Sequence, residues 1–287
     1  MGLFSDILLT VDYDRTLTAP DSTIPARNLE AIRWFIENGG AFTINTGRSL
    51  PMAKAFIDKV PVNAPLLLYN GAAAYDAARE ELTFIHEIQM DMWQTVRQMI
   101  ETFPDLTVEV QALDKHYDFL PNPAWDAFSA NNCAYATAEP DQDLGPFLKF
   151  SLYGELRGTS VAQLYQGSPE EIARMDEAEA LINEIYRDKV AVFRAGPRII
   201  DVQTNGVSKC RSARELQQQL GRKILVCAGD AENDVVMLDG ADYAFVPADA
   251  ILKDRYENVC KCSDGAVADV IYEKIPRILN LDLDKRE

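Results

Sequence analysis

Pairs of aspartates stand at two places in this sequence, far apart along the chain. Asp12 and Asp14 flank Tyr13, and Asp230 and Asp234 belong to the segment Gly-Asp-Ala-Glu-Asn-Asp. If the fold gathers these side chains, their negative charges repel one another unless a cation lies between them. Oxygen ligands without histidine suit a hard ion, and Mg²⁺ is the commonest such ion where phosphate is handled. The aspartates therefore predict a Mg²⁺ and phosphate site.

A calcium-binding loop of the EF-hand type is the alternative for the first pair. A loop beginning at Asp12 places Leu17 at its sixth position, where glycine is needed, and Thr23 at its twelfth, where glutamate is needed. The sequence excludes this alternative.

One lysine has the chemistry that a phosphate site needs. Lys209 follows Gly206-Val207-Ser208 at the start of a predicted helix, and the N-terminus of a helix favours anions. On its own such a lysine is more often a solvated surface residue. We expect Lys209 to bind phosphate only because the sequence also predicts the aspartate site.

The elements that position these residues alternate between strands and helices. Short apolar runs predict strands buried on both faces, and apolar residues at helical spacing predict the helices between them. The predicted strands are 7–11, 41–45 and 66–69, with helices at 25–38 and 51–60; the same pattern returns as a helix over 209–220, a strand over 224–228, a helix over 235–238 and a strand over 243–246. This order predicts an α/β fold with a doubly wound parallel sheet.

The carboxyl ends of parallel strands meet at one edge of the sheet, where open α/β folds bind ligands. In this sequence the residues at those ends are Asp12, Asp14, Thr46, Asn70 and Asp230. Each of them is an ordinary turn residue when taken singly. Their coincidence on every predicted core strand favours a common site.

The region between the two α/β blocks has a different pattern and composition. Residues 88–195 contain 18 Asp and Glu against 8 Lys and Arg, a net charge of −10 out of −17 for the whole chain. We therefore expect a core made of residues 1–86 and 196–287, with an α+β domain inserted at 87–195.

Four segments resemble, in order, the motifs of the haloacid dehalogenase superfamily of phosphatases. Asp12-Tyr13-Asp14-Arg15-Thr16 is similar to the first motif, Thr46-Gly47-Arg48 to the second, Lys209 to the third and Gly229–Asp234 to the fourth. The segments at 69–72 and 264–267 resemble the Cof-like branch, which inserts an α/β cap between the second and third motifs. The resemblance implies a core of Rossmann-like topology and a cap that sets substrate specificity.

The resemblance also implies a role for each matching residue. Asp12 is the expected nucleophile and Asp14 the expected general acid and base. The expected phosphate- or substrate-binding residues are Thr46, Arg48, Lys209 and Asn233, and the expected Mg²⁺ ligands are Asp12, Asp14 through its backbone carbonyl, Asp230 and Asp234. The implied reaction is hydrolysis of a small phosphomonoester, such as a sugar phosphate, through an aspartyl-phosphate.

Two positions depart from the family pattern. Arg15 stands where the family often has glycine, and Cys210 follows the motif lysine where glycine is frequent. Neither change removes a group that the chemistry needs.

Charge and cysteine usage limit the partners and the compartment. A net charge of −17 repels nucleic acids and anionic lipid headgroups, and no apolar run reaches the length of a membrane span. The five cysteines lack the spacing of a disulfide framework or a zinc site. We expect a cytoplasmic protein with reduced thiols, no nucleic-acid or membrane partner and a small phosphorylated metabolite as its ligand; the oligomeric state is left open.

Other interpretations remain at this point. A phosphomutase of the same superfamily passes the phosphoryl group to a substrate hydroxyl, and a sensor binds a phospho-ligand without turnover. His116 and the aromatic residues of the insertion either line a substrate pocket or belong to its hydrophobic core, and the second is the more common case. Those aromatic residues are Trp125, Phe128, Tyr135 and Tyr153.

Overall fold

The computed structural model describes residues 2–120, 133–154 and 166–281, so Trp125 and Phe128 lie outside the described residues. The chain divides into two compact units. Unit 1 comprises residues 1–47, 58–83 and 208–287, and unit 2 comprises residues 48–57 and 84–207.

Unit 1 is built on a parallel sheet, as the alternating pattern predicts. Its strands follow the order β14-β13-β12-β1-β2, and every neighbouring pair is parallel. The strands are β1 (Ile7–Val11), β2 (Ala41–Ile44), β12 (Ile224–Ala228), β13 (Tyr243–Pro247) and β14 (Glu257–Val259). The two central strands, β1 and β12, come from opposite ends of the sequence, which places their carboxyl ends side by side.

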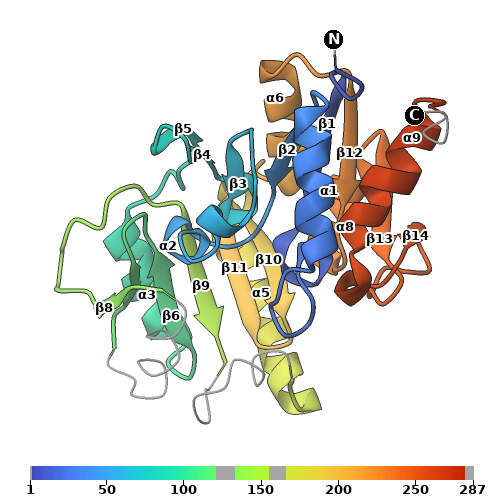
Figure 1. Ribbon diagram of the computed structural model, residues 1–287. Coiled ribbons are helices and arrows are strands. Elements are labelled where there is room, and N and C mark those ends of the chain that lie inside the picture. The colour runs from blue at the N-terminus through green and yellow to red at the C-terminus, as the bar shows by residue number, and fades with distance from the viewer. Residues whose placement is uncertain (1, 121–132, 155–165, 282–287) are drawn as a thin grey trace. The chain divides into compact units, whose positions relative to one another are not determined.

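Helices connect these strands and cover the sheet (Figure 1). Helix α1 (Ala26–Glu37) packs against α8 (Ala266–Asp269), and α6 (Lys209–Gln219) packs against α7 (Val235–Asp239). The short α9 (Ile275–Ile278) ends the described chain. Beside β2, β3 (Leu66–Leu68) forms an antiparallel ladder with β4 (Ala73–Asp76), followed by β5 (Glu81–Ile85).

Unit 2 has a six-stranded, mainly antiparallel sheet in the order β10-β11-β9-β6-β7-β8. Its strands are β6 (Thr107–Gln111), β7 (His116–Asp118), β8 (Tyr135–Thr137), β9 (Lys149–Tyr153), β10 (Val190–Gly196) and β11 (Ile199–Thr204). The helices of its described residues are α2 (Leu50–Ala53), α3 (Met92–Thr102) and α5 (Pro169–Tyr186). Apolar residues of α3 and α5 share one hydrophobic core with alternate residues of β6, β9 and β11, so the other set of alternate residues projects from the opposite face.

The division of the chain differs from the expected boundaries at three places, one of which is the short stretch 84–86, grouped with unit 2. Residues 196–207 belong to unit 2 because β11 pairs with both β9 and β10. Part of the predicted core helix 51–60 also groups with unit 2, within the segment 48–57 that contains the short α2, and a 3₁₀ turn follows at Ile57–Lys59. Strand pairing and contacts between segments distant in sequence underlie these differences, and no local pattern reveals them.

No helix in the described part of the chain combines the length and the apolar character that crossing a membrane requires.

A buried asparagine joins three segments of unit 1. The side chain of Asn28, on α1, donates to the Leu17 carbonyl at 3.0 Å and accepts from the Ala268 amide at 2.9 Å. Asn28 is fully buried, so both backbone groups lack access to water. The loop after β1 is therefore held by α1 and α8 together.

We predict that Asn28→Ala destabilises the protein by about 3 kcal/mol, because two buried backbone groups lose their hydrogen-bond partner. Asn38→Ala is the control, since the Asn38 side chain makes a single local hydrogen bond, to the Trp34 carbonyl at 2.8 Å. Urea unfolding measures both variants. Equal losses of stability in the two variants contradict the proposed role of Asn28.

Candidate active site

The central strands of unit 1 bring Asp12 and Asp230 to one edge of the sheet. Val11, the last residue of β1, pairs in parallel with Ala228, the last residue of β12. Asp12 follows directly and donates its amide to the Ala228 carbonyl at 2.9 Å, whereas Asp230 follows after Gly229. Both side chains are almost fully buried.

The ammonium group of Lys209 lies between two of the aspartates. Its Nζ is 2.6 Å from Asp12 Oδ1 and 2.7 Å from Asp234 Oδ1. Ligand oxygens of Asp12, Asp230 and Asp234 all lie within 4.8 Å of one another. Lys209 is 2% exposed, so it is a buried counter-ion and not the solvated helix lysine that its position alone suggests.

Burial and mutual repulsion destabilise the charged forms of these carboxylates. Burial raises the pKa of Asp12 well above its usual value, and the charges of Asp234, Asp230 and Asp14 add to this, although Lys209 opposes it. Burial and the charge of Asp234 raise the pKa of Asp230 to about 7. A divalent cation bound among these oxygens removes the cost of their charge, so the donor set fits a hard metal ion.

The charged form of Lys209, in contrast, is stabilised by its surroundings. Burial alone lowers the pKa of Lys209, but the nearby charges of Asp12 and Asp234 outweigh this effect and raise the pKa above its ordinary value. The ammonium form is therefore held permanently in the site.

The fourth motif folds around Asp234. Its Oδ2 accepts hydrogen bonds from the amides of Asp230 and Ala231 at 3.0 and 3.2 Å, while its Oδ1 accepts from Lys209. A Cβ atom at Gly229 would lie 2.6 Å from the Asp234 side chain, so only glycine permits this turn. Asp234 thus fixes the backbone that carries Asp230.

The remaining predicted residues occupy loops of the two units. Asp14 is half-buried, and its charge contributes to the raised pKa values of Asp12 and Asp230. Thr46 is buried just beyond β2, and Asn233 is half-buried in the turn Glu232–Asp234.

Arg48 is the exception, because it begins the segment that groups with unit 2. There its guanidinium lies 5.8 Å from the ring centroid of Phe56. The structure brings the carboxylates and Lys209 together within unit 1, and the role of Arg48 stays a prediction.

Two polar residues near the cluster escaped the sequence analysis. The buried Asn45 donates its side-chain amide to the Lys209 carbonyl at 2.8 Å, which ties β2 to the first turn of α6. Thr16 donates its hydroxyl to Asp230 Oδ1 at 3.4 Å. Thr16 stands inside the first motif segment and Asn45 directly before the second, and this position was the only signal that pointed to them.

The two positions that depart from the family pattern have different surroundings. Arg15 has a φ of 58°, a left-handed conformation that glycine adopts without strain. Cys210 packs against Gly240, where a Cβ atom would lie 2.1 Å from its sulfur. Burial raises the pKa of the Cys210 thiol, so it stays protonated and acts as a packing group.

His116 belongs to a buried polar cluster of unit 2. Its Nδ1 lies 3.1 Å from Glu109 Oε1, and its Nε2 lies 2.7 Å from the hydroxyl of Ser49, which caps α2. The Tyr153 hydroxyl also donates to Glu109 Oε1, at 3.1 Å. Neither His116 nor Tyr153 belongs to the hydrophobic core shared by α3 and α5.

Comparison with known proteins agrees with this fold. A family model described as haloacid dehalogenase-like hydrolase matches residues 9–271. The chain belongs to this family. A haloacid dehalogenase-like hydrolase from Bacteroides thetaiotaomicron has a similar structure, with a TM-score of 0.76 and 19% identity over 93% of this chain and 98% of that one.

Relatives with named activities have comparable similarity. The sugar phosphatase BT4131, of haloacid dehalogenase subclass IIB, has a TM-score of 0.71 and 16% identity over 95% of this chain and 98% of its own. The 5-amino-6-(5-phospho-D-ribitylamino)uracil phosphatase YwtE of Bacillus subtilis is 23% identical over 273 residues, covering 89% of this chain and 93% of that protein.

We predict different effects on stability for two substitutions in the cluster. Asp12→Asn leaves the free energy of unfolding in EDTA unchanged or higher, because it removes one charge from a crowded group while Lys209 retains Asp234. Lys209→Met lowers it by about 3–5 kcal/mol, because buried carboxylates lose their counter-ion. Urea unfolding of both variants measures this difference, and a loss of similar size in Asp12→Asn contradicts the prediction.

From the surroundings of His116 we predict that the stability of the protein depends on pH. Burial alone lowers the pKa of His116, but the charge of Glu109 and hydrogen bonds to Cys133 and Glu109 raise it to about 9. Protonated His116 therefore stabilises the fold fully below its unfolded pKa of about 6.5, and this stabilisation, at most about 3 kcal/mol, is lost as the pH rises through 9.

The measurement is the difference in unfolding free energy between the wild type and His116→Gln, taken at pH 6 and pH 10. We expect the wild type to be more stable than His116→Gln at pH 6, and this difference in unfolding free energy to be smaller at pH 10. His86→Gln is the control, because His86 is the chain's other histidine. An advantage that is independent of pH contradicts a charged His116.

Proposed function

We propose that the protein hydrolyses a small phosphomonoester through an aspartyl-phosphate on Asp12. The observation that supports this most directly is the buried contact of 2.6 Å between Lys209 Nζ and Asp12 Oδ1, beside Asp230 and Asp234. A carboxylate approaches a phosphate dianion only if positive charge offsets their repulsion, and Lys209 supplies part of that charge.

The proposed reaction uses Asp12 and Asp14 in succession. The Asp12 carboxylate attacks phosphorus, and the bond between phosphorus and the leaving oxygen breaks. Asp14, half-buried two residues further along the chain, gives its proton to the leaving alkoxide and then takes a proton from the water that hydrolyses the aspartyl-phosphate. Lys209, Thr46 and Asn233 hold the phosphoryl oxygens; Arg48 is proposed to assist in binding the substrate.

The proposed metal is Mg²⁺, held by the carboxylates of Asp12 and Asp230 and by the Asp14 backbone carbonyl. When bound, Mg²⁺ neutralises the phosphoryl oxygens and the nucleophile together. Asp234 accepts protein hydrogen bonds at both oxygens, so its proposed role is to orient Asp230 and Lys209.

The proposed substrate is a phosphorylated sugar or a related metabolite. Two similar proteins support this class, since one is a sugar phosphatase and the other acts on a phosphorylated ribityl compound by name. Unit 2, as an inserted cap, is proposed to select the leaving group. Its sheet carries buried hydroxyl, amide and charged side chains of the kind that recognise hydroxylated compounds, among them Gln111 and Ser151.

We predict that Asp12→Asn lowers kcat by at least about 10³-fold on every phosphomonoester tested, because no carboxylate remains to attack phosphorus. EDTA stops turnover by the wild type, and Mg²⁺ restores it, because the aspartates need a hard ion. Release of inorganic phosphate from a panel of phosphorylated metabolites and from a small aryl phosphate measures both effects.

Asp6→Asn is the matched control. Asp6 stands at the amino end of the same strand, β1, in an exposed ion pair with Lys223, so its variant should keep wild-type activity. Near-normal turnover by Asp12→Asn would falsify the assignment of the nucleophile. Transfer of the phosphoryl group to a second substrate molecule, without release of phosphate, would replace the hydrolase with a mutase.

A further inference from the structure

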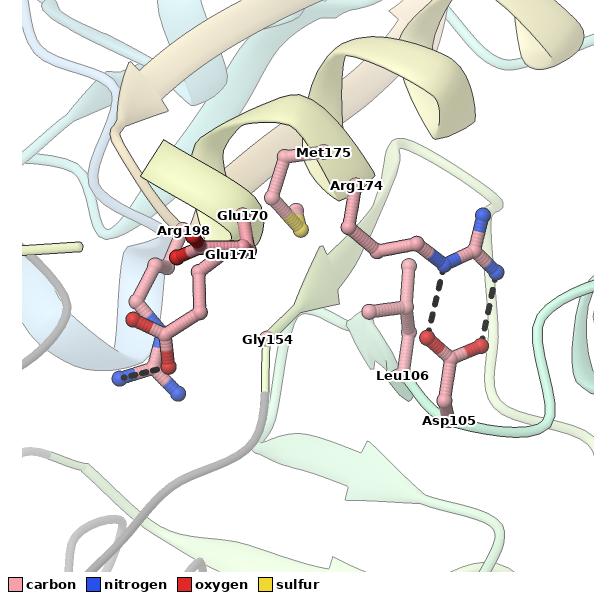
Figure 2. Close-up of a pocket in the computed structure, with 8 residues that line it drawn as sticks. All are labelled: Asp105, Leu106, Gly154, Glu170, Glu171, Arg174, Met175 and Arg198. Carbon is pink, nitrogen blue, oxygen red and sulfur yellow. Dashed lines mark hydrogen bonds and ion pairs between the residues drawn. The ribbon is translucent and has the colours of Figure 1, made fainter. Parts of the chain in front are cut away.

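Unit 2 contains a cavity of about 500 Å³ that the proposed reaction does not use. It lies between the N-terminal turns of α5 and the segments around Leu106 and Gly154 (Figure 2). Buried Leu106 and Met175 give it an apolar part. The charged residues that line it are Asp105, Glu170, Glu171, Arg174 and Arg198. Its volume is within the range typical of small-molecule sites.

Two arginines of the cavity differ in how their guanidinium groups are satisfied. Arg174 uses Nε and Nη2 for a two-pronged contact with Asp105, with both distances 2.7 Å. Arg198 has no hydrogen-bond partner at the same two atoms among the described residues, although it is only 5% exposed. Its nearest carboxylate, Glu171, lies 3.6 Å away and faces Nη1 instead.

An unpartnered cationic edge in a buried position is costly, because a buried donor loses water without gaining an acceptor. Two adjacent N–H groups of one guanidinium match the two oxygens of a carboxylate or phosphate. Arg174 and Asp105 display this match within the same cavity (Figure 2).

Gly154 makes room beside that edge. Its backbone amide donates to the Arg198 carbonyl at 3.0 Å, and a Cβ atom at this position would lie 3.0 Å from Arg198 Nε. An alanine would therefore crowd the nitrogen that lacks a partner.

We propose that this cavity binds the carboxylate of a small organic acid, with Nε and Nη2 of Arg198 donating to its two oxygens. The charges already present decide between carboxylate and phosphate. Two arginines face three acidic side chains, so a monoanion is accommodated more easily than a phosphate dianion. The apolar side chains of Leu106 and Met175 suit a short hydrocarbon portion. This proposal does not rest on the proposed function.

The test is an NMR titration of the full-length, ¹⁵N-labelled protein in EDTA, which observes the Nε–H signals of arginine directly. The probes are propionate, its uncharged analogue propionamide and inorganic phosphate. We expect propionate to shift the Arg198 signal saturably, and the other two to bind at least about tenfold more weakly. The Arg198 signal is identified by its loss in Arg198→Lys.

Three variants locate the site. Arg198→Lys keeps the charge but loses the fork and should weaken propionate binding at least about tenfold, measured by the remaining backbone signals. Gly154→Ala should weaken it similarly by crowding Nε, and it serves if Arg198→Lys fails to fold. Arg174→Lys, the control, should retain affinity within about threefold, because Asp105 already occupies that arginine.

Absence of a saturable shift with propionate overturns the proposal and leaves water as the partner of Arg198. Tighter binding of phosphate than of propionate overturns the assignment of a carboxylate. Equal effects of Arg174→Lys and Arg198→Lys show that the unpartnered edge does not determine binding.

Discussion

At the centre of unit 1, one buried ammonium group lies between two carboxylates that belong to different segments of the chain. The contact between Lys209 and Asp12 spans 197 positions of sequence, and the contact with Asp234 spans 25. Without Lys209, buried aspartates would face one another at the carboxyl ends of β1 and β12 with no internal counter-ion. The surrounding loops hold this cluster in place. Its three carboxylates outnumber the one ammonium group of Lys209.

The arrangement of those loops follows from backbone hydrogen bonds and from space. Asp234 accepts from two amides of its own turn and thereby directs Asp230, while Asn45 fixes the carbonyl of Lys209. Gly229 is required because any side chain there would collide with Asp234. The site is thus preorganised by side chains that need not contact substrate, which is how enzymes hold reacting groups in position.

In unit 2 the main constraint is the pairing of buried polar side chains. Its sheet packs one face against α3 and α5 and carries buried polar residues on the other, and such residues must find hydrogen-bond partners within the protein or in a ligand. His116 Nδ1 pairs with Glu109 Oε1 and its Nε2 with Ser49, although Glu109 Oε2 has no hydrogen-bond partner among the described residues. At the turn between β10 and β11, Arg198 is left with two donors unsatisfied. Arg198 therefore differs from His116, whose two ring nitrogens both have partners.

Much of the fold and of the carboxylate cluster was predictable from sequence because both depend on local patterns. The apolar runs of the parallel sheet are continuous, and motif residues at strand ends converge once those strands are parallel, which is why Asp12 and Asp230 were found together. Tertiary structure alone decided the rest. Lys209 becomes a buried counter-ion, Arg48 groups with unit 2, and residues 196–207 join the sheet of that unit. Burial, ion pairing and strand pairing are set by neighbours distant in sequence, and no pattern within a short window contains them.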